Sequence, residues 1–177
     1  MKSDEQLMLE YQGGSPHAFE QLFERYRNPV YGFFRRRLNN ASRAEELAQE
    51  TFVVILRDTE QYKPTARFRT YMYAIALKQL WSERRKEIRD GKLAAAVLHE
   101  ERPQGDPETG LWVRAALEQL DPDHREVLML REYEQLSYDE IAEVLAVPVN
   151  TVRSRLSRAR VELKSLLESQ SARGVSR

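Results

Sequence analysis

The chain has 177 residues, no net charge and no cysteine. This length suits one or two small domains, and the lack of cysteine excludes disulfides and thiolate metal sites. The hydrophobic residues, 41% of the chain, form no apolar run approaching the ~18 residues of a membrane span, and the polar, acidic start does not resemble a signal peptide. We therefore expect a cytoplasmic protein without membrane insertion.

Charge is distributed unevenly along the chain. Residues 61–92 carry a net charge of +6 and residues 147–177 a net charge of +5, whereas residues 93–146 carry −9. Two basic blocks separated by an acidic block are typical of a protein that contacts nucleic acid at two places.

The first part of the chain contains start and stop signals for helices. In chain order they are a capping box of Ser3 with Gln6, a stop at Gly13-Gly14, Ser15 as N-cap before Pro16, and a second capping box of Ser42 with Glu45. Pro29 either kinks the second of these helices or divides it in two. A polar loop is predicted from Asp58 to Ala66.

A long helix is predicted from about Arg67 to Arg89, and it mixes aromatic residues with cations. Aromatic rings can stack on unpaired bases while cations follow the phosphates. The same rings also recur at the spacing of core residues, so each of them either stacks on a base or packs in the core. The basic cluster from Arg84 to Lys86 is predicted to contact phosphate.

Residues 93–110 contain several prolines and glycines and are predicted to form a linker. After it we expect a helix from Leu111 to Leu120, then a helix capped by Asp121-Pro122, and a frayed tail over residues 170–177. The predicted fold is all-α, with two small helical domains, residues 1–92 and 111–169, joined by a flexible linker.

Residues 136–160, LSYDEIAEVLAVPVNTVRSRLSRAR, form the most specific pattern of the chain. Ser137 and Glu140 form a capping box, and Asn150 is the expected N-cap of a second helix. Ala146 stands where such turns often carry a glycine. The pattern predicts a C-terminal helix-turn-helix, whose second helix can enter the major groove of DNA.

The second helix of this motif has two different sides. Its apolar residues fall within one narrow arc: Val152, Leu156, Ala159 and Leu163. The opposite side holds Arg153, Ser154, Ser157 and Arg158, with Arg155 and Arg160 at the flanks. Arginine can pair bidentately with guanine, and serine can reach bases or phosphates. The simpler alternative is a solvated basic helix on an ordinary bundle.

The whole layout resembles the extracytoplasmic-function (ECF) group of RNA polymerase sigma factors. Four stretches carry the resemblance: AEELAQETF at 44–52, FRTYMYAIA at 68–76, SERRK at 82–86, and the helix-turn-helix. It covers about residues 15–92 as region 2 and 111–167 as region 4. The resemblance implies that region 2 binds core RNA polymerase and opens the −10 promoter element, and that region 4 reads the −35 element.

Pattern and resemblance together predict three sets of contact residues. The set for −35 DNA is Arg131, Asn150, Thr151, Arg153, Ser154, Arg155, Ser157 and Arg158. The set for −10 DNA is Tyr62, Lys63, Arg67, Tyr71, Lys78, Arg84 and Arg85, in which the loop from Tyr62 to Arg67 captures a flipped base. The set for core polymerase is Glu45, Glu46, Gln49 and Glu50.

The chain departs from the family pattern in region 2. Tyr71, Lys78 and Ser82 stand where the family commonly has Trp, Asn and Asp, so the −10 element that is read can differ. Arg43 occupies the first acidic position of the polymerase-docking helix, and a reversed charge there should weaken association with a basic partner.

This reversed charge suggests that docking is regulated. Some members of the family are activated by a Ser/Thr kinase that phosphorylates a threonine on the docking helix, and Thr51 is the candidate phosphosite. A phosphate would add roughly −1.5 to −2 charge and restore the acidity. In the alternative, Thr51 is a small packing residue and an anti-sigma factor controls the protein.

Catalysis has little support in the sequence. His17, His99 and His124 lie far apart without metal-ligand spacing, and there is no phosphate-binding glycine loop. We therefore expect that the protein is not an enzyme and that it binds no cofactor, metal ion or small-molecule substrate. Two other functions remain open: a helix-turn-helix regulator of duplex DNA that is not a polymerase subunit, and an adaptor that has lost DNA binding.

Overall fold

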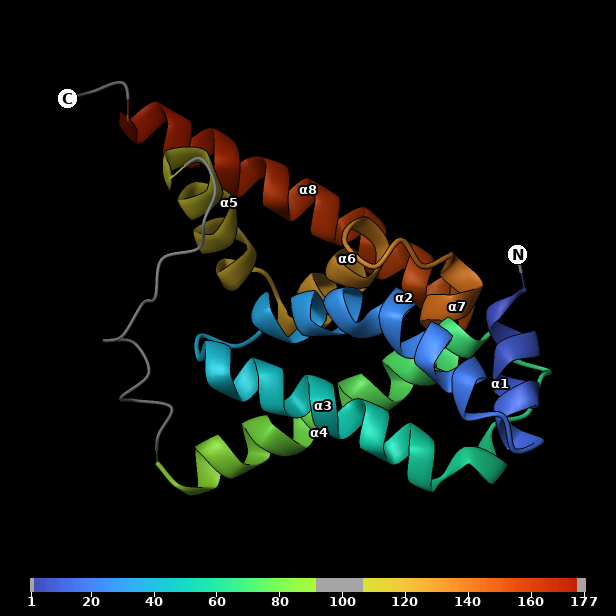
Figure 1. Ribbon diagram of the computed structural model, residues 1–177. Coiled ribbons are helices and arrows are strands. Elements are labelled where there is room, and N and C mark those ends of the chain that lie inside the picture. The colour runs from blue at the N-terminus through green and yellow to red at the C-terminus, as the bar shows by residue number, and fades with distance from the viewer. Residues whose placement is uncertain (1, 92–106, 175–177) are drawn as a thin grey trace. The chain divides into compact units, whose positions relative to one another are not determined.

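The computed structural model describes residues 2–91 and 107–174, and its regular elements in these ranges are helices (Figure 1). The predicted all-α fold is confirmed. Contacts divide the chain into two units, residues 1–101 and 102–177, which are described separately. Within the described ranges no helix is both long and apolar enough to cross a membrane.

The N-terminal unit is a bundle in which α2 packs on α1 and α3, and α4 packs on α3. Its elements are α1 (Asp4–Gln12), α2 (Pro16–Arg35), α3 (Ala41–Arg57), the 3₁₀ helix η1 (Thr59–Gln61) and α4 (Phe68–Arg89). α2 runs unbroken through Pro29, so a division of this helix at the proline is wrong. The polar loop predicted from Asp58 contains the short η1 helix.

The first predicted capping box is confirmed, and the second is wrong. The Ser3 hydroxyl accepts from Gln6 N at 3.2 Å, and Gln6 Oε1 accepts from Ser3 N at 3.0 Å. α3 begins at Ala41, with Asn40 as its N-cap and Asn40 Oδ1 accepting from Arg43 N at 2.9 Å. Asparagine caps a helix at least as well as serine, and the earlier start adds hydrogen bonds to the helix, so Ser42 lies inside the first turn.

The core of this unit decides which aromatic residues of α4 pack. Phe68 and Met72 are fully buried, and Tyr73 lies 5.7 Å from the Phe33 ring, centroid to centroid. Trp81 is 37% exposed. Two of the four rings of α4, Phe68 and Tyr73, are therefore core residues, and the exposed surface of the helix is mainly cationic.

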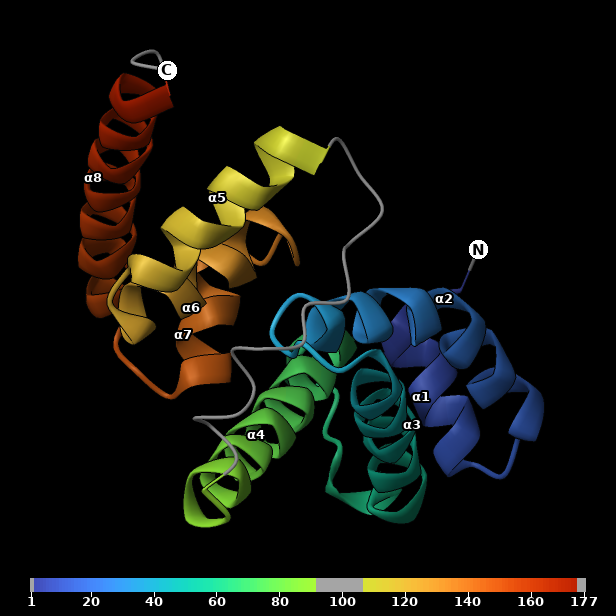
Figure 2. The same cartoon turned by 90° about the vertical axis from the view of Figure 1, so that its left-hand side faces the viewer.

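The C-terminal unit is built on one long helix, against which α5, α6 and α7 pack (Figure 2). Its elements are α5 (Pro107–Gln119), α6 (Pro122–Glu132), α7 (Tyr138–Leu145) and α8 (Val149–Gly174). The predicted cap of α6 is confirmed, since the Asp121 carboxylate accepts from the backbone of Asp123 at 2.9 Å and of His124 at 3.3 Å.

Two predicted boundaries of this unit are wrong. α5 begins at Pro107, inside the predicted linker, because proline suits the first helical position and a glycine inside a helix costs only about 1 kcal/mol. α8 continues to Gly174, through most of the predicted frayed tail. Residues 93–106 of the predicted linker, with His99, lie outside the described residues, as do residues 175–177.

Candidate nucleic-acid interface

The turn of the helix-turn-helix has the predicted local geometry. The Ser137 hydroxyl accepts from Glu140 N at 3.2 Å, and Glu140 Oε2 accepts from Ser137 N at 2.7 Å. Ala146 ends α7 in the left-handed conformation, with φ 53° and ψ 45°. This conformation costs an alanine about 1 kcal/mol, and it sets the direction in which α8 leaves the turn.

The two sides of α8 are separated as the sequence predicts. The apolar side is buried: Val152, Leu156 and Ala159 are each at most 1% exposed. Arg153, Ser154, Ser157 and Arg158 are exposed, and Thr151 beside them is half-buried. We call the exposed four residues the α8 polar face. It offers two guanidinium groups and two hydroxyls on a helix that begins immediately after the turn.

The N-terminus of α8 differs from the prediction. The helix begins at Val149, so Asn150 lies in its first turn and is not the N-cap. The Pro148 carbonyl accepts from Thr151 N at 2.9 Å, which starts the helix without a side-chain cap from Asn150. Asn150 Oδ1 accepts instead from Arg153 Nη1 at 3.3 Å. The amide therefore orients one of the exposed arginines.

Two cations of the predicted −35 set are engaged by the protein itself. Arg155 is half-buried and forms an ion pair of 2.5 Å with Asp123 at the start of α6. Arg131 donates to the Leu136 carbonyl at 2.9 Å and lies 5.5 Å from the centre of the Tyr138 ring. Both arginines join α6 to the helix-turn-helix, so in this structure they support the α8 polar face and are not part of it.

Polar pairs join the flank of α8 that faces α6 to that helix. Arg160 pairs with Glu132 at 3.1 Å, and His124 Nδ1 lies 3.1 Å from Glu162 Oε2. With the Arg155 pair, these contacts fix α8 to α6. The positive charge of α8 is consequently directed away from α6, toward the polar face.

In the N-terminal unit the predicted −10 loop begins at a buried residue, and most of the residues that follow are exposed. Tyr62 is 2% exposed, packs against Phe68 and Tyr71, and donates its hydroxyl to the Ala66 carbonyl at 3.0 Å. Its ring is therefore not available to stack on a base, which corrects the part that sequence reasoning gave to this side chain. Lys63 and Arg67 are exposed and remain predicted contacts.

The exposed residues of α4 continue from this loop. Tyr71, Lys78 and Arg85 recur every seven residues, which places them along one face of the helix. Lys78 and Arg85 are exposed, and Arg84 is half-buried. Tyr71 is half-buried, with its hydroxyl 3.4 Å from the Asp58 carbonyl, and burial raises its pKa. This face of α4 therefore carries two exposed cations and one half-buried tyrosine.

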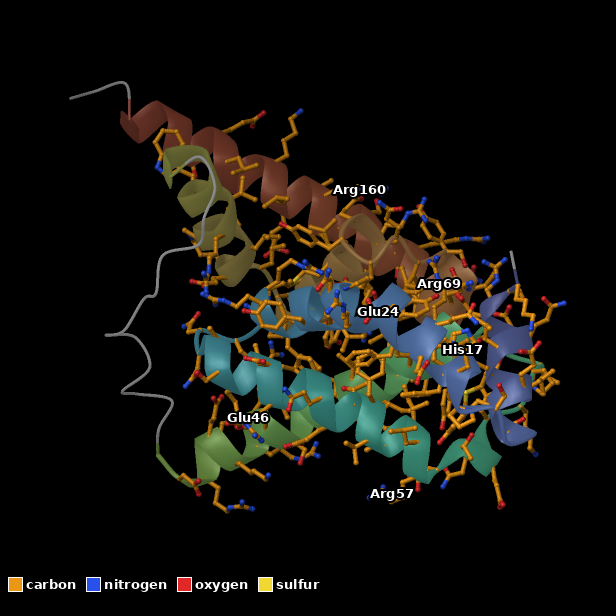
Figure 3. The ribbon with its side chains drawn as sticks, in the orientation of Figure 1. His17, Glu24, Glu46, Arg57, Arg69 and Arg160 are labelled. Carbon is orange, nitrogen blue, oxygen red and sulfur yellow. The ribbon has the colours of Figure 1, made fainter. Side chains whose placement is uncertain are left out.

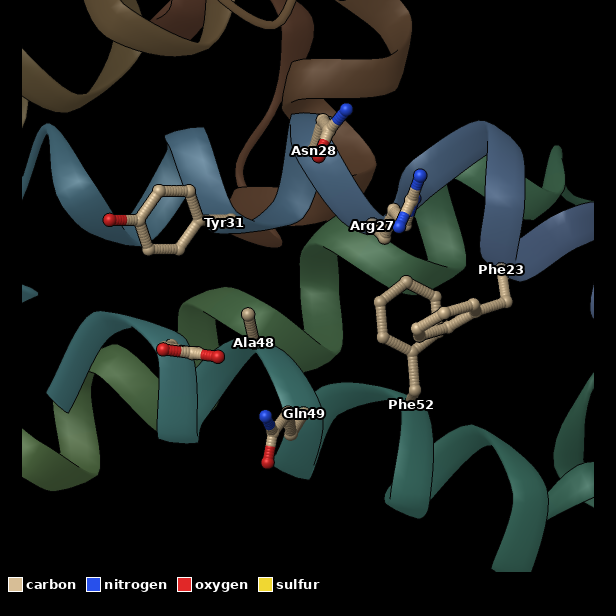
Figure 4. Close-up of a pocket in the computed structure, with 8 residues that line it drawn as sticks. Phe23, Arg27, Asn28, Tyr31, Ala48, Gln49 and Phe52 are labelled. Carbon is tan, nitrogen blue, oxygen red and sulfur yellow. The ribbon is translucent and has the colours of Figure 1, made fainter. Parts of the chain in front are cut away.

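The predicted polymerase set lies on the outer surface of α3, where all four side chains are exposed: Glu45, Glu46, Gln49 and Glu50. Figure 3 labels Glu46 and, near the end of the same helix, Arg57. Beside this surface is a hollow of about 390 Å³ between α2 and α3 (Figure 4). Its lining includes Phe23, Tyr31 and Phe52 as well as Glu45 and Gln49. Sequence reasoning found the acidic side of this surface but missed the aromatic side on α2.

Thr51 is not placed as a kinase substrate would be. It is fully buried between α3 and α4, and its hydroxyl lies 2.8 Å from the Leu47 carbonyl and 2.6 Å from Gln79 Oε1. A phosphate could enter only if the two helices separated. The candidate phosphosite is therefore corrected to a packing residue, which was the alternative reading of this position.

The fold and these surfaces define a class of protein: two helical units, one with a helix-turn-helix, each with an exposed basic face. Residues 22–89 match the family description Sigma-70 region 2, and residues 110–163 match Sigma-70, region 4. The chain belongs to the extracytoplasmic-function group of RNA polymerase sigma factors.

Known proteins similar to this chain support that membership. The RNA polymerase sigma-H factor of Pseudomonas aeruginosa is 32% identical over 94% of this chain and 95% of its own length. The RNA polymerase sigma factor CarQ of Myxococcus xanthus is 32% identical over 90% of this chain and 95% of its own length.

Solved structures have the same fold. CnrH, in complex with the cytosolic domain of CnrY, matches with a TM-score of 0.74 and 25% identity over 95% of this chain and 99% of that one. The sigma factor RpoE of Bartonella quintana, in complex with the anti-sigma factor NepR, matches with a TM-score of 0.72 and 23% identity over 85% of this chain and 96% of that one.

Proposed function

We propose that this chain is a promoter-recognition subunit of RNA polymerase, which binds the core enzyme and directs transcription initiation. The observation that carries the proposal is the α8 polar face, exposed directly after the turn and backed by a buried apolar side. The protein would act in the cytoplasm, where promoters are, without a catalytic centre or a small-molecule substrate of its own.

Reading of the −35 element is assigned to the α8 polar face. Arg153 and Arg158 can each pair bidentately with a guanine, and a good contact of this kind is worth about 1–3 kcal/mol of discrimination. Ser154, Ser157 and Thr151 can reach bases or phosphates. Arg131 and Arg155 would act by holding α6 and the turn against α8.

Contact with the −10 element is assigned to the exposed residues of the loop and to the exposed face of α4. Lys63 and Arg67 on the loop, followed by Lys78 and Arg85 on α4, form a cationic path of the kind that follows an unpaired strand. Since the Tyr62 ring is buried, capture of a flipped base would fall to the backbone and exposed side chains of residues 63–67.

Docking on core polymerase is assigned to the outer surface of α3 and the neighbouring hollow. The exposed carboxylates of Glu45, Glu46 and Glu50 suit a basic partner surface and would accelerate association. The hollow offers aromatic side chains from α2 and α3, the type of residue that anchors protein interfaces. The two features together supply charge complementarity and apolar contact.

Reconstituted transcription tests the proposal. Core RNA polymerase and the full chain would be mixed with templates randomised upstream of a reporter, and the templates that yield transcripts would be sequenced. A sigma factor selects two separated elements and only in the presence of core enzyme. If the chain alone selects duplex sites and the core enzyme adds nothing, the protein is a conventional helix-turn-helix regulator.

Matched variants separate DNA reading from charge. Arg153→Ala should lose the −35 preference, whereas Lys164→Ala, which also removes one exposed cation from α8, should keep it. If Arg153→Ala leaves promoter output unchanged while binding to core enzyme persists, the chain is an adaptor and the assignment of the α8 polar face fails.

Regulation by an anti-sigma factor is proposed in place of phosphorylation. CnrH, which is similar to this chain over nearly its whole length, was solved with the cytosolic domain of a second protein, CnrY. Titration of the holoenzyme with a candidate inhibitor protein from the same organism should release the chain from core polymerase. Release would be measured by fluorescence anisotropy of the labelled chain.

A further inference from the structure

The short helix α1 precedes residues 22–89, which match region 2, yet it makes specific contacts with the predicted −10 loop. The side-chain amide of Gln12 donates two hydrogen bonds, to the Thr59 carbonyl at 2.7 Å and to the Tyr62 carbonyl at 3.0 Å. The two carbonyls belong to η1 and to the residue after it. One side chain on α1 thus fixes the entry of the loop.

A second residue of α1 fixes the exit of the loop. The first residue of α4 is Phe68, and its N-cap, Arg67, makes no side-chain cap hydrogen bond. Glu5 Oε1 instead accepts from Phe68 N at 3.1 Å. A carboxylate at a helix N-terminus is also favoured by the helix dipole. Glu5 therefore caps α4 from another helix.

Helix α1 is itself held firmly in the unit. Leu7 and Met8 on its inner side are fully buried, and Asp4 forms an ion pair of 2.6 Å with Arg25 and accepts from the Tyr26 hydroxyl, both on α2. The carbonyls and the amide that α1 holds are consequently fixed to the core of the unit, while Lys63, Pro64 and Thr65 between them are exposed.

We propose that α1 is a positioning element for promoter opening, in which Gln12 and Glu5 set the loop from Tyr62 to Arg67 in the shape that receives an unpaired −10 base. This inference rests on the proposed function of the loop. A loop that is already ordered loses less conformational entropy when it binds, which raises its affinity. A loop held in one shape also cannot adapt to other bases, so its preference for the base that fits is stronger. The two residues act on the DNA only through the loop that they hold.

Selection from a randomised promoter library tests this role with the complete chain and core polymerase. Gln12→Leu removes both donors to the loop, and Glu5→Ala removes the cap of α4. Gln12→Leu should lower the base preference at the captured −10 position by up to about 25-fold and Glu5→Ala by up to about fivefold, because each hydrogen bond lost from an ordered site is worth about fivefold. The preference at the −35 element and the affinity for core polymerase should stay within about twofold of wild type.

Two further variants provide controls. Glu5→Gln keeps an oxygen that can accept from Phe68 N and should retain most of the preference. Glu10→Gln, on the same helix but paired only at the surface with Lys2, should resemble wild type. Circular dichroism of each variant reports helix content. If Gln12→Leu does not fold, the difference in −10 base preference between Glu5→Ala and Glu5→Gln tests the positioning role of α1.

The outcomes separate this inference from the proposed function. If the −10 and −35 preferences fall together, or if neither changes, α1 is an ordinary packing helix and the positioning role is wrong. If wild-type holoenzyme selects no promoter at all, the proposed function fails and the inference falls with it. A loss confined to the −10 position in Gln12→Leu and Glu5→Ala supports the positioning role.

Discussion

The Arg43 guanidinium on α3 holds the Glu83 carboxylate on α4 with two parallel hydrogen bonds of 2.8 and 2.7 Å. Arg43 Nη1 also donates to Glu46 at 2.7 Å and lies 3.4 Å from Glu50. The hydrogen bonds to Glu83, with those to Glu46 and the nearby charges, raise the pKa of Arg43 above its ordinary value. One cation among three carboxylates leaves the proposed docking surface acidic, so the reversed charge at Arg43 should weaken association with core polymerase less than the sequence suggested.

Removal of Glu83 should destabilise the N-terminal unit. Glu83→Ala leaves Arg43 without its bidentate partner across the α3–α4 contact, and we expect the free energy of unfolding to fall by about 2 kcal/mol. Glu50→Ala removes only the long, exposed contact to the same arginine and should cost less than about 0.5 kcal/mol. Urea unfolding measures both losses. Equal losses would show that the bidentate ion pair stabilises the unit no more than the exposed contact does.

Substitutions of Thr51 should affect stability and not activation. Thr51→Val keeps the shape but removes the hydroxyl that contacts Leu47 and Gln79, and should cost about 1 kcal/mol. Thr51→Glu buries an unpaired charge and should cost about 3 kcal/mol or more, measured by urea unfolding. Transcription per folded molecule with Thr51→Val should equal that of wild type. A gain of activity with Thr51→Glu would restore the kinase hypothesis.

A glycine at the turn of the helix-turn-helix should stabilise the C-terminal unit. Ala146 has φ 53°, a conformation that costs an alanine more than a glycine. Ala146→Gly should therefore raise the free energy of unfolding by about 0.5 kcal/mol after the entropy of the unfolded chain is counted, whereas Ala146→Val should lower it by about 1–2 kcal/mol. Thermal melts of both variants check the order, and a less stable glycine variant would contradict it.

Local signals account for most of the fold that could be predicted. A capping box joins residues three apart, so Ser3 with Gln6 and Ser137 with Glu140 could be identified from the sequence alone. The separation of buried Val152 from exposed Arg153 follows in the same way from helical periodicity. Where two good caps compete within one turn, as Asn40 and Ser42 do, the sequence does not decide between them.

Partners that are distant in the sequence could not be predicted. Periodicity placed Arg155 beside the reading residues, but α6 brings Asp123 to it. The sequence placed Tyr62 among the −10 contacts, but the rings of Phe68 and Tyr71 on α4 pack against it. It also offered Thr51 as a phosphosite, but Gln79 on α4 contacts the hydroxyl. In each case the neighbour that removes the side chain from the surface comes from a different helix, and a single sequence does not reveal which helices meet.

The two arginines that sequence reasoning grouped together should respond differently to truncation. Arg153→Ala removes an exposed member of the α8 polar face and should weaken specific promoter binding about tenfold while leaving stability within about 0.5 kcal/mol. Arg155→Ala breaks the pair between half-buried Arg155 and exposed Asp123 and should mainly lower the free energy of unfolding, by about 0.5–1 kcal/mol. Holoenzyme binding to a selected promoter and urea unfolding measure the two effects. An equal loss of binding by both variants would place Arg155 on the DNA.

High pH should weaken the N-terminal unit through Tyr62. Burial raises the pKa of Tyr62 to about 12, and the carboxylates of Glu5 and Asp4 add to the shift. An unfolded tyrosine loses its proton near pH ~10, so the folded chain holds this proton more tightly. Its contribution to stability is complete below pH ~10 and is lost as the pH rises from ~10 to ~12.

Tyr62→Phe cannot ionise and should make the alkaline fall of the unfolding free energy shallower. The fall should persist in part, because burial and the Asp4 hydrogen bond also raise the pKa of Tyr26. Urea unfolding at pH ~8 and pH ~11, with Tyr31→Phe as the exposed control, compares the slopes. Equal slopes in Tyr62→Phe and wild type would mean that the tyrosine is not buried in solution.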